Sequence, residues 1–478
     1  MVKILCFLGI LLSYILFLFS DEKALSILYI PWALFTISIA CFYYIKERDV
    51  TVQKFWLRPS IICFFGLIIV GYQLSIDDCL GYSSLEQSVF VGASQYADKS
   101  FFSVSIFLFA YILGLKKSQN TLFNQVKNDT NKLHASVWLI LMLLSFGLFL
   151  SSIDVRFYLS GASYHGSGAY DYQASLTNSF ESLFQVFFHI TLACYVKLLS
   201  LNHNQSKTCK NFFKGFPVLF WVCVVLYLIL RLLSGDRGPV IYNSLALVYA
   251  FVWYSKYRFK FSIVIITLVL GASFVTFLGT FRSRSSDLNI VEKITETVER
   301  RNEIDEQSIF MGTYELARSI DTHVLAIRDI ERDKTTYSYG KYTFFSLLTS
   351  IPGLKTKYLY DLGFKPDEIN SAMYFTISSQ GKHFNFNEGS SMFGESYLEL
   401  GVLGMVIIGF LLGSIFKQLD FSIMQNRPLS VICIAVILII SEHAIYMGRS
   451  SFSYELSNVI HMLILYYIIN FFIKKISQ

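Results

Sequence analysis

Long apolar runs follow one another along almost the whole chain, and they constrain its fold more than any motif does. The chain has 478 residues, of which 54% are hydrophobic and only 15% charged. Runs of about 20 apolar residues are typical of helices that cross a bilayer. The first run, 4–19, is followed by Asp21-Glu22-Lys23 without a small-residue cleavage site. We therefore interpret it as a first transmembrane helix and not as a signal peptide.

The apolar runs predict an all-α integral membrane protein with about 12 transmembrane helices. If the N-terminus lies inside, basic residues gather in inner loops such as 46–58, 116–134 and 200–214, whereas the short outer loops carry few of them. This distribution follows the positive-inside rule and fixes the expected orientation. The predicted spans are 4–19, 24–45, 59–76, 101–115, 135–153, 180–199, 215–233, 239–255, 260–280, 392–416, 429–447 and 453–473.

A polar stretch of about 110 residues separates the ninth span from the tenth and falls on the outer side. It divides the chain into spans one to nine (1–280), a large helical extracytoplasmic loop (281–391) and spans ten to twelve (392–478). The loop carries 14 Lys and Arg against 16 Asp and Glu, so any anion site in it must be local. Two smaller outer loops, 77–100 and 154–179, are long enough to be structured.

Parts of the large loop show helical patterning. Leu316, Ile320, Val324 and Ile327 recur on one helical face, which predicts an amphipathic helix over about 309–332. Two further elements are expected: a charged helix over 289–306, and an apolar patch over 342–351 that Pro352-Gly353 ends.

Arginines at outer helix ends are the first candidates for chemistry. Arg231 and Arg237 flank the turn between spans seven and eight, and Arg282 and Arg284 follow span nine. Guanidinium groups bind phosphate oxygens with two parallel hydrogen bonds, and a helix N-terminus also favours anions. We expect these four residues to bind a lipid diphosphate. The alternative is structural, with Arg237 paired to Asp236 and Arg231 reaching to the interface.

Ionisable residues also open the tenth span. Glu395 falls in its first turn, where a carboxylate is costly unless it is paired or hydrogen-bonded. Glu395 and His383 are the predicted catalytic residues, acting as general base toward a sugar hydroxyl, and Glu388 could serve instead. The structural alternatives are a helix N-terminal carboxylate for Glu395 and a solvated loop residue for His383.

Glu442, His443 and Arg449 lie at the outer ends of spans eleven and twelve. Ionisable groups at this depth are candidates for function, so His443 and Arg449 are added to the predicted substrate-binding residues. A structural Glu442–Arg449 pair explains the pattern equally well.

Several classes of site are not indicated. The basic residues lie in separate short loops, which argues against a nucleic-acid partner. No CxxC pattern, HExxH or Walker A motif occurs, so we expect neither a metal nor a nucleotide cofactor.

The second half of the chain resembles a known family. The stretches YSYGKYTFFSLLTSIPG (337–353) and EGSSMFGESYLELGVLG (388–404) are similar to the outer loop and following helix of Wzy-type oligosaccharide repeat-unit polymerases, the O-antigen and capsule polymerases of bacteria. SGDRGPVIYN (234–243) resembles their glycine-arginine turn between two central spans.

The resemblance implies a GT-C-like, metal-independent membrane glycosyltransferase of the bacterial cytoplasmic (inner) membrane, with its active site facing the periplasm or exterior. Its substrates would be undecaprenyl-pyrophosphate-linked oligosaccharides, and its partners a chain-length regulator and a flippase. Arg237 and Arg282 match arginine positions expected to bind pyrophosphate, and Glu395 matches the acidic residue that opens the late helix.

Other functions remain open at this point. An O-antigen ligase has the same layout and would depend on a loop histidine such as His383. A lipid-linked oligosaccharide flippase or other transporter would instead place charged residues in mid-span. A non-catalytic scaffold of an export complex is the remaining alternative.

Overall fold

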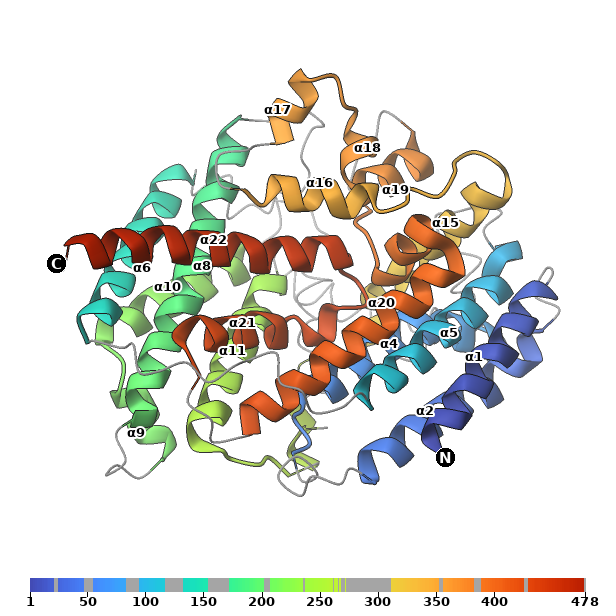
Figure 1. The fold of residues 1–478 in the computed structure, drawn as a ribbon, viewed down its shortest axis with the longest axis horizontal. Helices are drawn as coiled ribbons and strands as arrows, with labels where there is room; N and C mark the ends of the chain where they lie inside the picture. The colour runs from blue at the N-terminus through green and yellow to red at the C-terminus, as the bar shows by residue number, and fades with distance from the viewer. Residues whose placement is uncertain are drawn as a thin grey trace, which may run out of the picture. The chain divides into compact units, whose positions relative to one another are not determined.

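Helices form the regular structure of the described part of the chain, and no strand occurs in it (Figure 1). This agrees with the predicted fold class. The computed structural model describes residues 1–20, 25–46, 55–82, 94–116, 132–153, 172–201, 207–234, 237–260, 262–264, 266–267, 271, 311–351, 356–381, 388–424 and 429–476.

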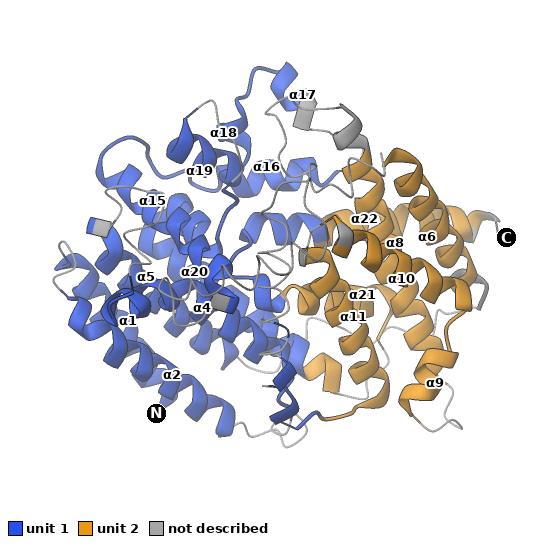
Figure 2. Ribbon diagram, turned by 180° about the vertical axis from the view of Figure 1, so that it is seen from behind, with its two compact units in different colours: residues 1–120, 259–420, 444–458 blue, residues 121–258, 421–443, 459–478 orange. Residues whose placement is uncertain are grey.

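The chain divides into two compact units, coloured separately in Figure 2. Unit 1 comprises 1–120, 259–420 and 444–458, and unit 2 comprises 121–258, 421–443 and 459–478. Helices of unit 1 are α1 (Val2–Leu18), η1 (Ser26–Leu28), α2 (Tyr29–Ile45), α4 (Pro59–Cys79), η2 (Ser94–Tyr96), α5 (Ala97–Leu115), α14 (Met311–Ala317), η4 (Arg318–Ile320), α15 (Asp321–Glu331), α16 (Lys341–Thr349), α17 (Thr356–Asp361), α18 (Pro366–Ile369), α19 (Ser371–Gln380) and η5 (Ala444–Tyr446).

Helices of unit 2 are α6 (Lys132–Ser152), α8 (Tyr172–Leu201), α9 (Cys209–Lys214), α10 (Val218–Leu233), α11 (Arg237–Ser255) and α21 (Val431–Glu442). Two helices extend over a boundary between the units in the sequence: α20 (Met392–Met424) and α22 (Phe452–Ile476).

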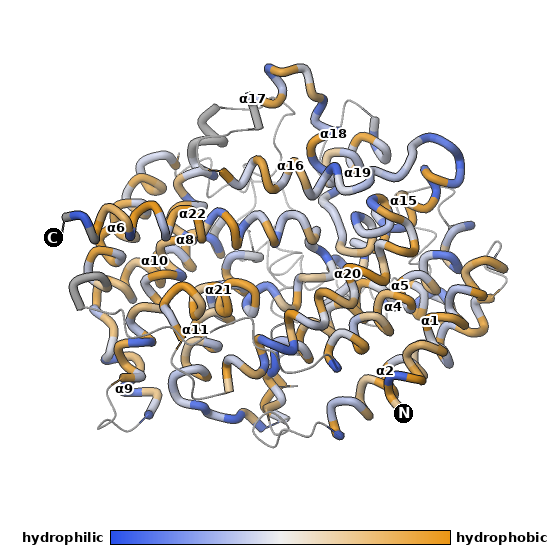
Figure 3. The backbone as a smooth tube through the Cα atoms, viewed as in Figure 1, coloured by the Kyte–Doolittle hydropathy of each residue, from blue (hydrophilic) through white to orange (hydrophobic). Residues whose placement is uncertain are grey.

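Seven described helices are long and apolar enough to cross a membrane, and three shorter apolar helices accompany them. Figure 3 shows apolar residues along α1, α2, α6 and α8, whereas polar and apolar residues mix along 311–381. Ten of the predicted spans overlap one of these apolar helices. The eighth, 239–255, falls on α11, which is helical but is not among them, and most of the ninth, 260–280, lies outside the described residues. The chain is thus a multi-pass membrane protein, while the total of twelve and the GT-C-like arrangement stay predictions.

Two expectations about the outer loops can be refined. Helix α8 begins at Tyr172, so the predicted loop 154–179 ends eight residues earlier than expected. The predicted loop 77–100 is shortened at both ends, because α4 continues to Cys79 and α5 begins at Ala97. Polar residues of both stretches, such as Asn178 and Asp98, occupy the ends of long helices.

Close backbone packing joins α20 to α5. A Cβ atom added to Gly413 would lie 2.0 Å from the carbonyl oxygen of Tyr111, and one added to Gly114 would lie 2.1 Å from that of Phe410. Gly409 makes a similar approach to the carbonyl of Phe107. Small residues four apart allow membrane helices to approach this closely where lipid supplies no hydrophobic driving force.

Helix α20 is broken near its start. Leu400 and Gly401 leave helical geometry, and Gly401 has a φ of +61°, which favours glycine. The amides of Ser338 and Tyr339 donate to the carbonyls of Leu398 (2.9 Å) and Glu399 (3.0 Å), the two residues before the break. The large polar segment thus satisfies carbonyl groups that the break leaves without helical partners.

The described part of the large polar segment forms short helices, of which α15 packs onto α5 and α14 onto α4. The predicted amphipathic helix over 309–332 is confirmed as α14, η4 and α15, and the apolar patch over 342–351 largely forms α16. His323 of α15 is buried and bonds to Ser103 Oγ of α5 (2.7 Å), and Lys99 forms an ion pair with Glu331 (2.6 Å). The charged helix predicted over 289–306 lies outside the described residues.

Candidate functional site

Stretches of unit 1 that are distant in the sequence meet at the start of α20. Thr322 in the first turn of α15 donates a hydrogen bond to the hydroxyl of Ser391 (2.7 Å), the residue before α20. The amide of Met392 donates to the carbonyl of Gly448 (3.2 Å), in the turn before α22. These bonds bring the polar segment and two transmembrane helix starts together.

Arg449, in the same turn before α22, reaches α14. Its guanidinium donates to the carbonyl of Glu315 (3.3 Å). We call the resulting group of residues, 315–322, 388–395 and 448–453, the junction cluster.

Two helix N-termini contribute to the junction cluster. Ser391 Oγ accepts from the amide of Gly394 (2.9 Å) at the start of α20, and Ser451 Oγ accepts from the amide of Tyr454 (3.2 Å) at the start of α22. A Cβ atom added to Gly394 would lie 2.9 Å from Thr322 Oγ1, so the close contact with α15 requires glycine there. Helix N-termini carry partial positive charge, which favours a nearby anion.

Glu395 ties three helices together inside the cluster. It is 1% exposed, and its carboxylate accepts from Ser371 Oγ of α19 (2.6 Å), Ser453 Oγ (2.8 Å) and the Ser453 amide (2.9 Å) of α22. The sequence places this residue in the first turn of α20, and it lies there. The hydrogen bonds offset the cost of burying the carboxylate. Its role as general base stays a prediction.

A second carboxylate of the cluster combines burial with a nearby cation. Asp321 is 5% exposed, and its Oδ2 lies 3.8 Å from Nε of Arg318. Burial raises the pKa of Asp321 to about 7, an effect that Arg318 opposes and the charge of Glu388 reinforces. Burial also raises the pKa of Glu388, which accepts from Gln380 Nε2 (2.9 Å). A carboxylate that titrates near neutrality suits proton transfer.

Arg318 and Arg449 place two guanidinium groups near one end of α14. Arg318 lies three residues after Glu315, whose carbonyl Arg449 contacts, so the two attachment points are one helical turn apart. The Arg318 side chain is 36% exposed and Arg449 is also exposed, so both remain accessible to a ligand. Two arginines beside helix N-termini form a chemically suitable environment for a diphosphate.

Unit 2 contains a separate polar network among its apolar helices. Arg231 of α10 forms an ion pair with Glu181 of α8, and Tyr227 donates to the same carboxylate (2.5 Å). One turn further along α8, Gln185 donates its side-chain amide to Tyr227 (2.7 Å), and its carbonyl contacts His189 Nδ1 (2.7 Å).

The same network continues to α21. His189 and Glu442 form a pair at 2.8 Å, with side chains 1% and 2% exposed. Glu442 lies 3.6 Å from His443, whose ring packs against Tyr242 with centroids 4.2 Å apart. Arg231 and His443, both predicted from the sequence, therefore stand at opposite ends of one chain of contacts. Paired ionisable groups within apolar helices are typical of functional sites, although they also stabilise helix packing.

The remaining predicted residues are only partly described. Arg237 is the first residue of α11, as expected for the start of span eight, but its side chain lies outside the described structure. Arg282, Arg284 and His383 also lie outside the described residues. Within the described residues, no three His, Cys, Asp or Glu side chains come together in a way that could hold a metal ion.

Sequence reasoning missed Arg318, Asp321, Glu181 and His189. The sequence did contain a signal for Arg318 and Asp321. They lie three residues apart in the predicted amphipathic helix, next to its apolar face. The signal for Glu181 and His189 was weaker, because each is a single polar residue whose partner lies on another helix.

The helices define the class of protein: an all-helical, multi-pass membrane protein with a polar helical segment packed onto its spans. A family model described as O-antigen polysaccharide polymerase Wzy matches residues 1–477. The chain belongs to this family, which confirms the resemblance and extends it over nearly the whole sequence. No curated protein and no solved structure matched the chain in the corresponding comparisons.

Proposed function

We propose that this chain joins undecaprenyl-pyrophosphate-linked oligosaccharide repeat units into a surface polysaccharide, O-antigen or capsule, at the outer face of the bacterial cytoplasmic membrane. Membership of the Wzy family supports the polymerisation. The single observation that carries the choice of site is the junction cluster, in which Arg318 lies 3.8 Å from the buried carboxylate of Asp321 and Arg449 contacts the nearby carbonyl of Glu315.

The reaction requires a leaving group, an acceptor and a proton carrier. The hydroxyl oxygen of an incoming repeat unit forms a bond to the anomeric carbon of the growing glycan. The bond between that carbon and the diphosphate breaks, and its electron pair leaves with the lipid-linked diphosphate. The hydroxyl proton passes to a carboxylate of the protein.

Arg318 and Arg449 stabilise the departing diphosphate in this proposal. Negative charge on the diphosphate increases as the bond breaks, so cationic donors bind the transition state more strongly than the ground state. Guanidinium groups thereby fill the role that a metal ion has in many phosphate sites. Arg237 and Arg282 remain predicted diphosphate ligands on the strength of the resemblance, and Arg284 remains one because of its position directly after span nine.

The carboxylates Asp321 and Glu388 are our candidates for the proton acceptor. Asp321 has a pKa of about 7, and its charge interacts with that of Glu388, so the two act as a coupled pair. Glu395, predicted as base together with His383, is in this proposal a positioning residue that holds Ser371 and Ser453. His383 keeps its predicted role.

Arg231 and His443 keep their predicted role in substrate binding, within the network of unit 2. The apolar helices hold the polyprenyl chain, and the polar segment covers the sugars. A chain-length regulator and a flippase are the proposed partners.

The test is deletion of the gene followed by complementation, with surface polysaccharide analysed on gels. Loss of a polymerase leaves single repeat units on the acceptor, loss of a ligase leaves none, and loss of a flippase traps units on the inner leaflet. We expect the Arg318→Ala, Arg449→Ala double variant to leave single units, because removal of transition-state donors costs about 10²-fold or more in rate.

Arg332→Ala is the matched control, because Arg332 is exposed on the same segment and contacts Tyr96 outside the junction cluster. This variant should restore the full ladder of polysaccharide chain lengths on the gel. Membrane levels of both variants, measured by immunoblot, separate loss of function from loss of protein. A full ladder from the double arginine variant would contradict the site.

A further inference from the structure

The polar segment contains a pocket that is separate from the junction cluster. It has a volume of about 280 Å³ and is lined by Asp329, Lys334, Asp367, Tyr374, Ile377 and Ser378. These residues come from α15, α18, α19 and the turn after α15. Asp329 follows Asp321 by eight residues on α15, which places the two carboxylates about 12 Å apart along the helix axis.

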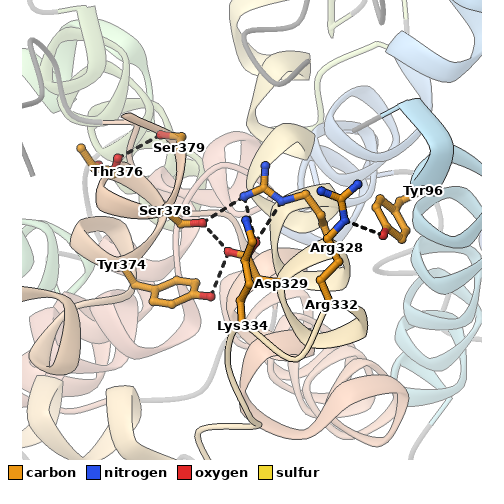
Figure 4. A network of polar contacts seen from close by, with 9 residues as sticks. All are labelled: Tyr96, Arg328, Asp329, Arg332, Lys334, Tyr374, Thr376, Ser378 and Ser379. Carbon is orange, nitrogen blue, oxygen red and sulfur yellow. Dashed lines mark hydrogen bonds and ion pairs between the residues drawn. The ribbon is translucent and has the colours of Figure 1, made fainter. Parts of the chain in front are cut away.

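Contacts with neighbouring residues hold the side chain of Asp329 in one position in this pocket (Figure 4). It is 1% exposed and forms an ion pair with Arg328 (2.8 Å), while the hydroxyls of Tyr374 (3.1 Å) and Ser378 donate to its other oxygen. Its backbone carbonyl accepts from the amide of Lys334 (2.9 Å). This many contacts hold the lining side chains in one arrangement before any ligand binds, which reduces the entropic cost of binding.

Asp367 and Lys334 supply the polar groups that face a ligand. Lys334 is 54% exposed and its Nζ lies 3.8 Å from Asp329. Asp367 is half-buried in the first turn of α18, and no hydrogen bond to its carboxylate comes from the described residues. A carboxylate accepts from hydroxyl groups, whereas an ammonium donates to them.

The charges that line the pocket and its volume limit the class of ligand that it can bind. Two carboxylates in one small pocket disfavour a phosphate, and the polar lining disfavours a lipid chain. The volume lies near the lower end of small-molecule sites, about 300 Å³. Tyr374 adds an aromatic surface of the kind that packs against the apolar side of a small polar molecule. A single sugar ring combines this size with many hydroxyl groups.

We propose that this pocket binds one neutral sugar residue of the repeat unit, at a distance from the reacting sugar. The inference rests on the proposed function, since it assigns the substrate of the same polymerase. The sugar donates hydroxyl hydrogen bonds to Asp367 and accepts one from Lys334. Binding remote from the reacting bond positions the glycan relative to the junction cluster.

The test uses the purified full-length chain in liposomes with lipid-linked repeat units from the same bacterium. Asp367→Asn and Lys334→Gln should each raise the half-saturating concentration of the repeat unit about tenfold, with the maximal rate little changed, because each removes a hydrogen bond to a charged group. Asp361→Asn is the control, since Asp361 is exposed on α17 outside the pocket. If the half-saturating concentration is unchanged in these two variants, or if only the maximal rate falls, the proposal that the pocket binds a sugar is wrong.

Direct titration of the released repeat-unit oligosaccharide onto the same protein separates this inference from the proposed function. Binding to the wild-type chain that weakens about tenfold in Asp367→Asn supports the pocket even if no polymer forms. Equal binding to both proteins overturns it even if polymerisation is intact. Absence of oligosaccharide binding to the wild-type chain, measured at concentrations that saturate polymerisation, overturns it as well.

Discussion

At the scale of single residues, burial decides what the carboxylates of the junction cluster can do. Asp321 and Glu395 are both buried, at 5% and 1% exposure. Glu395 is surrounded by hydroxyl and amide donors, so its hydrogen-bonding capacity is used by the protein. Asp321 has Arg318 at 3.8 Å instead. The first carboxylate therefore suits a structural role and the second suits proton transfer.

The titration of Asp321 leads to a prediction about stability. Its folded-state pKa of about 7 lies above 3.8, the ordinary pKa of an aspartate, so the folded state binds this proton more tightly than the unfolded state. The stabilisation is fully present below about pH 4 and is lost as the pH rises through about 7. Asp321→Asn cannot ionise, so it should raise the melting temperature relative to wild type at pH 8 more than at pH 5.

The same variant should lower polymerisation by about 10²-fold or more, as expected for the loss of a general base. Thermal unfolding in detergent at both pH values, together with the liposome assay, checks both effects. A variant with wild-type activity, or one less stable than wild type specifically at pH 8, would contradict our account of Asp321.

At the scale of helices, α20 links the packing of the spans to the junction cluster. Its glycines allow close contact with α5, its break at Leu400 and Gly401 receives the polar segment, and its first turn carries Glu395. Tight packing along the later part of α20 therefore holds the first turn in position. A change in the packing between α20 and α5 should therefore alter the junction cluster, although the packing contacts lie outside the cluster.

Gly413→Ala tests the role of close packing. The added Cβ atom would lie 2.0 Å from the carbonyl oxygen of Tyr111, so the helices must separate, at a cost of about 1–3 kcal/mol or more. Gly147→Ala in α6 is the matched control, because no atom lies within 4 Å of its added Cβ. Alanine favours a helix by about 1 kcal/mol over glycine, so the control should be neutral or stabilising. Unfolding curves in detergent measure both, and equal stability of the two variants would refute the packing role.

At the scale of the whole molecule, the orientation in the membrane determines which substrate the polar segment can reach. The predicted topology places 281–391 outside and 200–214 inside. Asp361 is exposed on α17, and Cys209 is exposed at the start of α9. These two positions therefore report on opposite sides of the membrane.

We predict that Asp361→Cys reacts with a membrane-impermeant maleimide in intact spheroplasts, and that Cys209 reacts only after permeabilisation. Serine should first replace Cys41, Cys79 and Cys433, the other exposed or half-buried cysteines, so that they do not interfere with the two thiols that are compared. Labelling is read by a gel shift. The reverse pattern would place the polar segment inside and exclude the proposed reaction at the outer face.

The sequence by itself determined the parts of this protein that depend on local pattern. Apolar runs located the spans, because a helix in lipid must satisfy its backbone within a single segment. The spacing of Leu316, Ile320, Val324 and Ile327 located the amphipathic helix for a similar reason. Family membership followed from short motifs at 234–243, 337–353 and 388–404 and was confirmed over 1–477.

Only the tertiary structure decided which polar residues act together. Nothing in the sequence around Arg318 and Asp321 indicates that Arg449 joins them. The folded chain creates the site, because the turn before α22 places Arg449 against α14. Glu395 gained its partners from α19 and α22, 24 and 58 residues away in the sequence. Contacts of this kind depend on how helices pack, and neither hydropathy nor spacing records that packing.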